Sequence, residues 1–370
     1  MASTNFALIG VGGYIAPRHM EAIKRVGGTL RAAVDPKDSV GIIDRHFPDA
    51  HFFVDFEPFA EHVARLAGTP AAIDYVSICS PNHLHKSHMS WALRAGADAI
   101  CEKPLLLDPG EIADLARLER STAKRINAIL QLRLHPSIVE LKRTIDADRS
   151  GRVWDIDLTY VTARGRWYHV SWKGDDLKSG GIATNIGVHF YDMLSFLFGS
   201  PLAAHVHHRA PDCAAGFLQY EKARVRWLLS INRRHMTTAE GFAQRSMTIH
   251  DLGLYDFSRG FEDLHAASYE AILAGRGFGI ADARPSIETV AHIRTAPIEP
   301  ARSGQQHPLL ARVLAEADAS GDGLTGQFHA LELDRDGLGG CRHVLGARDE
   351  GGAISAAPSP SPVGGEDVRP

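Results

Sequence analysis

The stretch "FALIGVGGYIAPRHM", residues 6–20, decides the fold: an apolar run leads into Gly10, Gly12 and Gly13, and a helical pattern follows. Glycines at such a turn let the backbone approach a pyrophosphate, whose charge the N-terminus of the helix stabilises. The usual dinucleotide fingerprint has a third glycine where this chain has Ile15. A tight strand–helix turn without a ligand is therefore the alternative interpretation.

The alternation of strands and helices continues outward from this turn. We predict strands at 6–11, 30–35, 51–54, 74–80, 98–103 and 126–131, with helical patterns at 17–26, 57–68, 85–96 and 110–123. Strands separated by helices of this length form a parallel sheet, and nearly all-apolar strands are covered on both faces. The sequence therefore predicts an α/β chain whose residues 1–130 form a Rossmann domain, a doubly wound parallel sheet.

An acidic residue ends the second predicted strand. Asp35 follows Gly10 by 25 residues, close to the spacing of about 20 expected for an acid that binds the ribose of a dinucleotide. A carboxylate accepts hydrogen bonds from both ribose hydroxyls and repels a 2′-phosphate. We therefore expect NAD as the cofactor rather than NADP, although the nearby Lys37 keeps this preference moderate.

The pattern changes after Leu130. In "VWDIDLTYV", residues 153–161, apolar and polar residues alternate with the period of a strand that has one buried face. Two predicted strand pairs, at 216–231 and 245–260, and helices at 136–147, 184–198, 263–275 and 284–296 complete this half. We predict a C-terminal α+β domain over residues 131–317, with a mostly antiparallel sheet.

From Asp318 onward the chain is rich in Gly, Asp, Ser and Pro. Such a composition does not bury enough apolar surface to offset the entropy of ordering, so we predict a disordered tail over residues 318–370. The segment 318–329 imitates a calcium-binding EF-hand loop, but His329 stands where that loop needs a bidentate glutamate. We expect no calcium there.

The composition of the 370 residues is that of an ordinary globular protein, with 44% apolar residues and a net charge of −4. This charge gives no reason to expect nucleic acid as a partner. No apolar run approaches the length of about 20 residues that a membrane span needs, and the N-terminus has no basic region typical of a signal peptide. The four cysteines form no CxxC pair, so we expect a reduced, cytoplasmic protein.

The ends of two predicted strands carry candidate ligand-binding and catalytic residues. "SICSPNHLH", residues 77–85, and "ICEKP", residues 100–104, end predicted strands four and five, and ligands of doubly wound sheets bind at those ends. Lys103 is thus placed where a nicotinamide and a substrate would meet, and its ammonium group stabilises an alkoxide as it forms. Glu102 and Lys103 point to opposite faces, so we do not expect them to pair. Histidines cluster at 83–88 and 205–208 without acids or cysteines at ligand spacing, so no metal site is predicted.

Four segments of the chain resemble the Gfo/Idh/MocA oxidoreductases, and the resemblance extends over roughly residues 5–315. These segments are "GVGGYIAPRH", "SPNHLH", "AGADAICEKP" and "GGIATNIGVHFYDML" (180–194). This resemblance implies an NAD-dependent dehydrogenase in which His189 is the candidate general base and Lys103 its catalytic partner. Many relatives have aspartate where this chain has Asn185, whose amide is still able to hold a substrate hydroxyl. Asn185 and His189 are four residues apart, which places them on one face of the predicted helix.

Within the family, "ARGRWY" (163–168), "SWKGD" and "ATNIGVHFYDM" are most similar to bacterial dehydrogenases that oxidise the C3 hydroxyl of UDP-N-acetylglucosaminuronate (UDP-GlcNAcA). That resemblance implies a nucleotide-sugar substrate and a role in making surface polysaccharides such as the lipopolysaccharide O-antigen. We predict that the cofactor contacts Gly10, Gly12, Gly13, Tyr14, Ile15, Asp35, Ser80, Asn82, His85, Glu102 and Lys103. We predict that the substrate contacts Gln131, Arg164, Trp172, Lys173 and Asn185, since cationic and aromatic groups suit a diphosphate and a uronate carboxylate.

Two other functions stay open. The chain resembles enzymes that act on inositol or on simple sugars, and the same fold also supports sugar-sensing regulators without catalysis. The presence of both Lys103 and His189 argues against a regulator. Family members commonly associate through the sheet of the second domain, so the resemblance also implies a homodimer or homotetramer.

Overall fold

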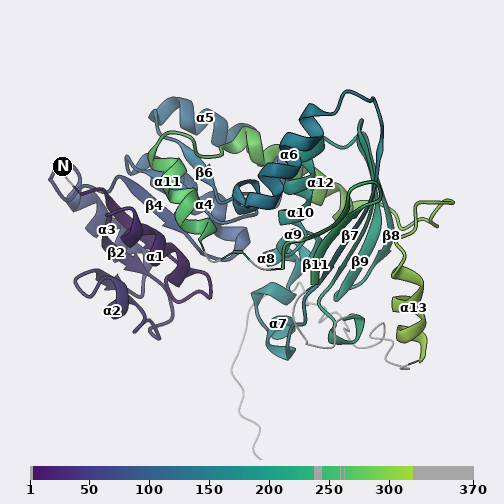
Figure 1. Cartoon of the computed structure of the whole chain (residues 1–370). Coiled ribbons are helices and arrows are strands. Elements are labelled where there is room, and N and C mark those ends of the chain that lie inside the picture. Colours follow the sequence, from purple (N-terminus) through teal and green to yellow (C-terminus); the bar gives the residue numbers. More distant parts are fainter. Residues whose placement is uncertain (1–2, 237–243, 259, 262, 320–370) are drawn as a thin grey trace, which may run out of the picture. The chain divides into compact units, whose positions relative to one another are not determined.

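Two six-stranded sheets organise the chain (Figure 1). The computed structural model describes residues 3–236, 244–258, 260–261 and 263–319. All of these belong to one unit, Met1–Asp322, and a second unit, Gly323–Pro370, lies outside the described residues.

Sheet A confirms the predicted Rossmann fold. Its strands are β1 (Asn5–Ile9), β2 (Thr29–Val34), β3 (His51–Phe53), β4 (Tyr75–Ile78), β5 (Asp98–Cys101) and β6 (Ile126–Ala128). They run in the order β3-β2-β1-β4-β5-β6, and every neighbouring pair is parallel. All six end before the predicted residue, because the last residues of those apolar runs already belong to the loops at the carboxyl edge.

Helices cover both faces of sheet A, as the all-apolar strands predict. They are α1 (Ala16–Arg25), α2 (Ile43–His46), α3 (Phe56–Leu66), α4 (His85–Arg94) and α5 (Ile112–Thr122), with α11 (Leu264–Leu273) and α12 (Ile280–Thr295) from the C-terminal half. One face forms a core with α1 and α11, and the other with α3, α4, α5 and the first half of α12. Helices predicted for the second domain therefore share the core of the first, and the boundaries at residues 130 and 317 stay predictions.

Sheet B is mixed and mostly antiparallel, as predicted. Its strands are β7 (Trp154–Val161), β8 (Ala203–Arg209), β9 (Cys213–Gln219), β10 (Ala223–Ser230), β11 (Gln244–Ile249) and β12 (Gly253–Asp256), in the order β12-β11-β7-β10-β9-β8. Only β7 and β10 pair in parallel. The sequence analysis missed β8, whose three histidines obscure the apolar alternation.

One face of sheet B is the apolar face predicted from the alternation in β7. The side chains of Trp154, Ile156 and Leu158 are buried on it, against α6 (Pro136–Ala147) and α10 (Val188–Phe198). At its centre, the rings of Tyr191 on α10 and Trp227 on β10 pack edge to face, 5.6 Å apart. This packing holds α10 in place.

The helix predicted over 184–198 is wrong in one respect, because it is two helices. Helix α9 (Gly181–Asn185) ends before α10 begins at Val188. A Cβ atom on Gly187, between them, would lie 2.5 Å from the carbonyl oxygen of Ala183 and from a methyl group of Leu229. The break therefore lets the backbone lie close against β10, and Asn185 and His189 belong to different helices rather than to one helix face.

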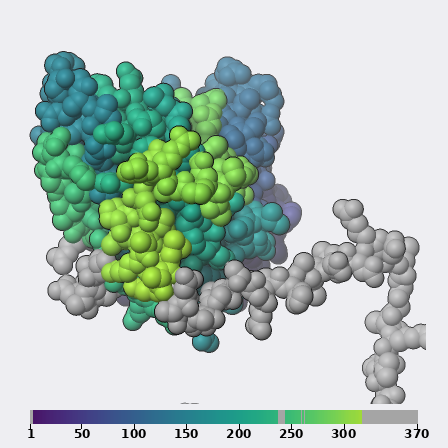
Figure 2. Space-filling view, turned by 90° about the vertical axis from the view of Figure 1, so that its right-hand side faces the viewer, coloured from purple at the N-terminus to yellow at the C-terminus, as the bar shows by residue number. Residues whose placement is uncertain are grey.

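The opposite face of sheet B is partly covered by α13 (Leu310–Ala319), which the sequence analysis did not predict. Leu310 and Val313 pack on Val161, Cys213 and Leu228, and Figure 2 shows this segment in yellow-green across the middle of the view. The helix runs through Ala319, so the first two residues of the predicted tail are helical. The rest of the tail, with the EF-hand-like segment and Cys341, lies outside the described residues.

Short helical segments connect these elements: α7 (Arg166–Val170), α8 (Asp176–Ser179) and the 3₁₀ helices η1 (Asn82–Leu84), η2 (Pro109–Glu111), η3 (Gln131–Leu134), η4 (Trp172–Gly174) and η5 (Arg233–His235). In the part of the chain that the structure describes, no helix combines the length and apolar character needed to cross a membrane.

Candidate functional site

The glycine turn after β1 has the geometry of a dinucleotide cradle. Gly10 has a φ of 85°, which favours glycine, and a Cβ there would lie 2.7 Å from the backbone of Cys79 and Ser80. Helix α1 follows with no side-chain cap and no acidic residue in its first turn. Its N-terminus can therefore stabilise a pyrophosphate, so the residues present fit NAD. Tyr14 beside the turn is 89% exposed.

Asp35 lies directly after β2, beside this turn. Its carboxylate accepts hydrogen bonds from the backbone N–H groups of Gly12 and Lys37, both at 2.9 Å. A Cβ on Gly12 would lie 3.1 Å from the carboxylate carbon of Asp35, so a larger residue there would require this carboxylate to shift. The predicted ribose-binding acid and the predicted turn are thus adjacent.

The loop after β4 is tied to the segment after β5 by His85. This buried side chain places Nδ1 2.7 Å from the carbonyl oxygen of Pro104 and Nε2 2.8 Å from that of Ser80. We predicted that His85 contacts the cofactor, but both of its ring nitrogens are occupied by the protein itself. These two contacts tie together the loops that carry Ser80 and Lys103, and the contact between His85 and the cofactor stays a prediction.

Glu102, which we also predicted to contact the cofactor, has two partners within the protein. Its carboxylate is buried and accepts hydrogen bonds from His19 on α1 and His265 on α11, both at 3.0 Å. Burial alone would raise the pKa of Glu102, but these hydrogen bonds hold it well below its usual value. His19 continues the network through Tyr269, at 2.8 Å, to Ser77.

These three residues, His19, Glu102 and His265, are the one group in the described part of the chain with metal-ligand spacing. Both histidines lie at hydrogen-bonding distance from the same carboxylate oxygen, so the cluster is explained without an ion. As expected from their opposite directions, Glu102 and Lys103 form no ion pair in the described structure. Glu102 provides a buried negative charge behind Lys103.

Lys103 and His189 are the predicted catalytic residues, and the charge of Lys103 acts on His189. Burial lowers the pKa of Lys103, and the neighbouring Arg164 and Arg245 lower it further, while Glu102 opposes them. Burial also holds the pKa of His189 well below 6.5, and the charge of Lys103 acts in the same direction. His189 is therefore neutral at neutral pH, the state in which an imidazole accepts a proton. No described residue hydrogen-bonds to its ring.

Asn185, the last residue of α9, is joined by hydrogen bonds to Lys103 and to Tyr168. Its side-chain amide donates to the Tyr168 hydroxyl at 2.8 Å, and its backbone carbonyl oxygen accepts from Nζ of Lys103 at 3.4 Å. Asn82, after β4, donates to the carbonyl oxygen of Ser179 at 2.8 Å. These contacts bring together Asn82 and Lys103, which follow strands of sheet A, and Asn185 of α9, although Asn185 and Asn82 already have protein partners.

The segment 163–181 supplies further cations. Nζ of Lys173 lies 3.9 Å from the centre of the Trp172 ring. Burial lowers the pKa of Lys173 to about 8, and the nearby charges of Lys103 and Arg164 contribute. Arg164, Trp172 and Lys173 are half-buried, whereas Lys178 is exposed and pairs with Asp175.

Gln131 and His189 line the same small cavity, of about 70 Å³, with Leu132, Tyr160, Phe190, Arg245 and Phe261. Gln131 is buried, and its Oε1 has no hydrogen-bond partner among the described residues. The neighbouring Arg133 has a structural role, because it donates two hydrogen bonds to Asp192 on α10.

Arg245 is a site residue that the sequence analysis missed. It begins the inward-facing series of β11, in which Met247 and Ile249 are fully buried. A charge at an inward position of an apolar alternation is the signal that would have identified it.

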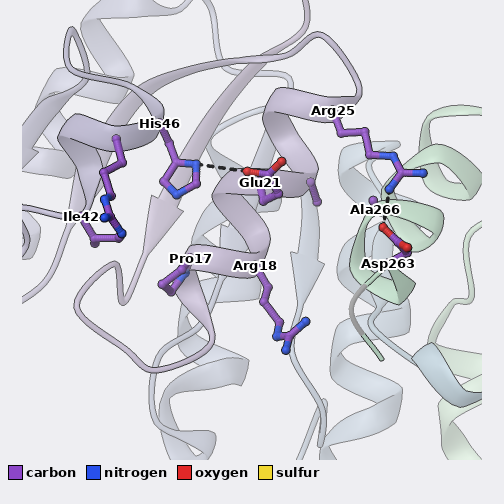
Figure 3. Close-up of a pocket in the computed structure, with 10 residues that line it drawn as sticks. Pro17, Arg18, Glu21, Arg25, Ile42, His46, Asp263 and Ala266 are labelled. Atoms are coloured by element: carbon purple, nitrogen blue, oxygen red, sulfur yellow. Dashed lines mark hydrogen bonds and ion pairs between the residues drawn. The ribbon is translucent and has the colours of Figure 1, made fainter. Parts of the chain in front are cut away.

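A larger cavity, of about 320 Å³, lies between α1, α2 and α11 (Figure 3). Its charged groups are mixed in sign: Arg25 pairs with Asp263 at 2.6 Å, and His46 lies 3.5 Å from Glu21. None of its lining residues follows the carboxyl end of a strand of sheet A, so we do not place the reaction there.

Comparisons with known proteins agree with this arrangement. Residues 4–129 match the model of an oxidoreductase family with an NAD-binding Rossmann fold, and residues 142–250 match the model of the C-terminal α/β domain of the same family. A similar solved structure is that of the WlbA (WbpB) dehydrogenase from Thermus thermophilus in complex with NAD and UDP-GlcNAcA. The sequence of that protein is 47% identical to this chain. The match covers 83% of this chain and all of that one, with a TM-score of 0.80.

A second structure of the Thermus thermophilus dehydrogenase, in complex with NAD and alpha-ketoglutarate, gives a TM-score of 0.79 at the same identity and coverage. The D-glucoside 3-dehydrogenase of Escherichia coli is 28% identical over 36% of this chain. That match spans 38% of the relative, well under half of its length.

Proposed function

Because the chain belongs to the Gfo/Idh/MocA oxidoreductases, we propose that it oxidises the C3 hydroxyl of UDP-GlcNAcA to the 3-keto sugar, with NAD as the cofactor. The solved complex of a 47% identical dehydrogenase with NAD and UDP-GlcNAcA supports this substrate. The match covers the whole of that chain, so both of its domains have counterparts here.

The observation that carries the proposal is a neutral histidine beside a group of cations. His189 has its pKa held low by burial and by Lys103, and the charges of Lys103, Lys173 and Arg164 act on one another. Cations this close repel one another in the free protein. An anionic substrate relieves that repulsion, and UDP-GlcNAcA carries both a diphosphate and a carboxylate.

In the proposed reaction, His189 removes the proton of the C3 hydroxyl while the C3–H bond breaks. The Lys103 ammonium group stabilises the oxygen as negative charge develops on it. When bound, NAD supplies the hydride acceptor. Glu102, held by His19 and His265, keeps a negative charge behind Lys103 and so favours its protonated form.

The test is NADH formation from UDP-GlcNAcA by His189→Asn and Lys103→Met. His189→Asn removes the base, which typically costs about 10²–10⁴-fold in rate, and Lys103→Met should also depress turnover. Both variants should still bind NAD by calorimetry, because the glycine turn and Asp35 remain. His51→Asn, the same substitution at an exposed position of β3, the edge strand of sheet A, should keep full activity. Near-normal turnover of both site variants would refute the assignment.

Two alternatives keep this fold. One is a dehydrogenase for another sugar or an inositol, which the similarity to D-glucoside 3-dehydrogenase favours; turnover of a free glucoside or inositol but not of UDP-GlcNAcA would select it. The other is a sugar-sensing regulator, which would bind the sugar without reducing NAD even in a single turnover.

We further propose that the chain works as a homodimer or homotetramer in the cytoplasm, in bacterial surface-polysaccharide synthesis. Beyond the part covered by α13, the outer face of sheet B carries an ion-pair ladder, Arg224 with Asp155 at 2.6 Å and Arg226 with Asp157 at 2.6 Å, which suits a polar interface. Cys79, Cys101 and Cys213 are free and buried, which suits a reducing compartment. A monomer mass by light scattering would contradict the assembly.

A further inference from the structure

The small cavity beside His189 contains a cation, Arg245, that has no counter-ion among the described residues. Arg245 lines it together with Gln131 and His189, and Nε of Arg245 is buried with no hydrogen-bond partner in the described structure. No acidic side chain among the described residues forms an ion pair with Arg245. A buried donor left unpaired costs free energy, so this arrangement is expected where a ligand supplies the missing acceptor.

Packing fixes the guanidinium group in this cavity. Its carbon lies 4.6 Å from the centre of the Phe261 ring and 5.3 Å from that of Tyr160. Tyr160 is the cross-strand partner of Arg245 in sheet B, and the backbone N–H of Arg245 donates to the Ser258 hydroxyl at 3.0 Å. The group is therefore held in place before a ligand arrives, and its planar fork matches a carboxylate.

Charge and size indicate which anion it takes. The charge of Arg245 acts on both Lys103 and His189, so the group lies near the reacting C3 position. On the proposed substrate, the carboxylate is attached directly to the sugar ring, whereas the diphosphate leads away from the ring toward the uridine. A cavity of about 70 Å³ between aromatic rings suits the compact carboxylate.

We propose that Arg245 determines substrate specificity by binding the sugar carboxylate of the nucleotide-sugar uronate. This inference rests on the proposed function, and it names the group by which the protein distinguishes the acid from the neutral sugar UDP-N-acetylglucosamine (UDP-GlcNAc). The neutral sugar has a hydroxymethyl group in place of the carboxylate and leaves the guanidinium group without its anion.

The experiment measures kcat/KM for UDP-GlcNAcA and for UDP-GlcNAc with the full-length NAD-loaded enzyme. Arg245→Met keeps the packing of the stem but loses the charged hydrogen bonds, so the kcat/KM for the acid should fall about 10- to 100-fold. The value for the neutral sugar should change less than about threefold. Arg245→Lys keeps the charge but not the planar fork, so its kcat/KM for the acid should lie between those of the wild-type enzyme and Arg245→Met. Most of the loss should appear in KM.

Arg164→Met is the matched control, because Arg164 belongs to the same group of cations but does not line the cavity. We expect Arg164→Met to lower kcat/KM by the same factor for both nucleotide sugars. Two results would overturn the proposal. One is an equal loss of kcat/KM for the acid and for the neutral sugar in Arg245→Met. The other is an Arg164→Met variant that changes the ratio of the two kcat/KM values as strongly as Arg245→Met does.

Binding of both sugars by calorimetry separates this inference from the proposed function. If wild-type protein oxidises neither sugar, the proposed function fails, but a preference for binding the acid that disappears in Arg245→Met still supports the carboxylate site. Equal affinity of wild-type protein for the two sugars overturns it. If Arg245→Met fails to bind NAD, Arg245→Lys decides the matter by the same ratio.

Discussion

A buried ion pair joins the helix that carries His189 to the segment that carries Gln131. Arg133 donates from Nε to Asp192 at 3.0 Å and from Nη2 at 2.8 Å, and the two side chains are 7% and 3% exposed. Asp192 lies on α10, one turn after His189. The pair therefore sets the distance between His189 and the far wall of the cavity.

Replacing Asp192 with Asn removes the negative charge and leaves the buried Arg133 guanidinium with only its longer, half-exposed ion pair to Asp282, at 3.4 Å. Breaking a buried pair in this way costs about 3–5 kcal/mol. An unfolding entropy of about 2.1 cal/mol/K per residue gives roughly 0.7 kcal/mol/K for about 320 folded residues. We therefore expect the melting temperature of Asp192→Asn to fall by about 4–8 °C, and kcat to fall although no residue of the site has changed.

The matched control is Asp263→Asn, which breaks an Asp–Arg pair of similar length, 2.6 Å to Arg25, whose side chains are 81% and 49% exposed. Solvent screening limits such a pair to about 0.2–1 kcal/mol, or less than about 2 °C. Scanning calorimetry with low and high salt measures both variants, and salt should reduce only the exposed contribution. Equal shifts for the two variants would refute the reasoning. Combining Arg133→Met with Asp192→Leu, which removes both charges, should recover most of the loss.

Two further predictions concern the cofactor and the base. The pKa of His189 is held well below 6.5 by burial and by Lys103, and the base must be neutral, so activity should persist as the pH falls through 6.5 and be lost only below it. A loss of kcat that begins at or above pH 6.5 would contradict this prediction. Lys103→Met removes the positive charge near His189 and should therefore move the loss of kcat to higher pH. Because Asp35 lies beside the glycine turn, NAD should bind far more tightly than NADP and Asp35→Ala should erode the difference, whereas equal affinities in wild-type protein by calorimetry would rule this out.

Local patterns were sufficient for most of the fold. The apolar runs predicted all six strands of sheet A, because a strand buried on both faces needs apolar residues throughout. The alternation from Trp154 to Tyr160 predicted the buried face of β7, because side chains along a strand point to opposite faces in turn. The same logic placed Lys103 at a strand end, where doubly wound sheets bind their ligands, and Asp35 beside the glycine turn.

Contacts between distant parts of the chain were decided only by the tertiary structure. Glu102 binds His19 and His265, which are 83 and 163 residues away, and α11 completes the core of the Rossmann sheet from the far end of the chain. Arg245 meets His189 in the same way, across two elements. A periodic pattern records which face of a strand or helix is buried, but not which distant element covers it. That choice depends on how whole elements pack, and so do the partner of Glu102 and the cavity around Arg245.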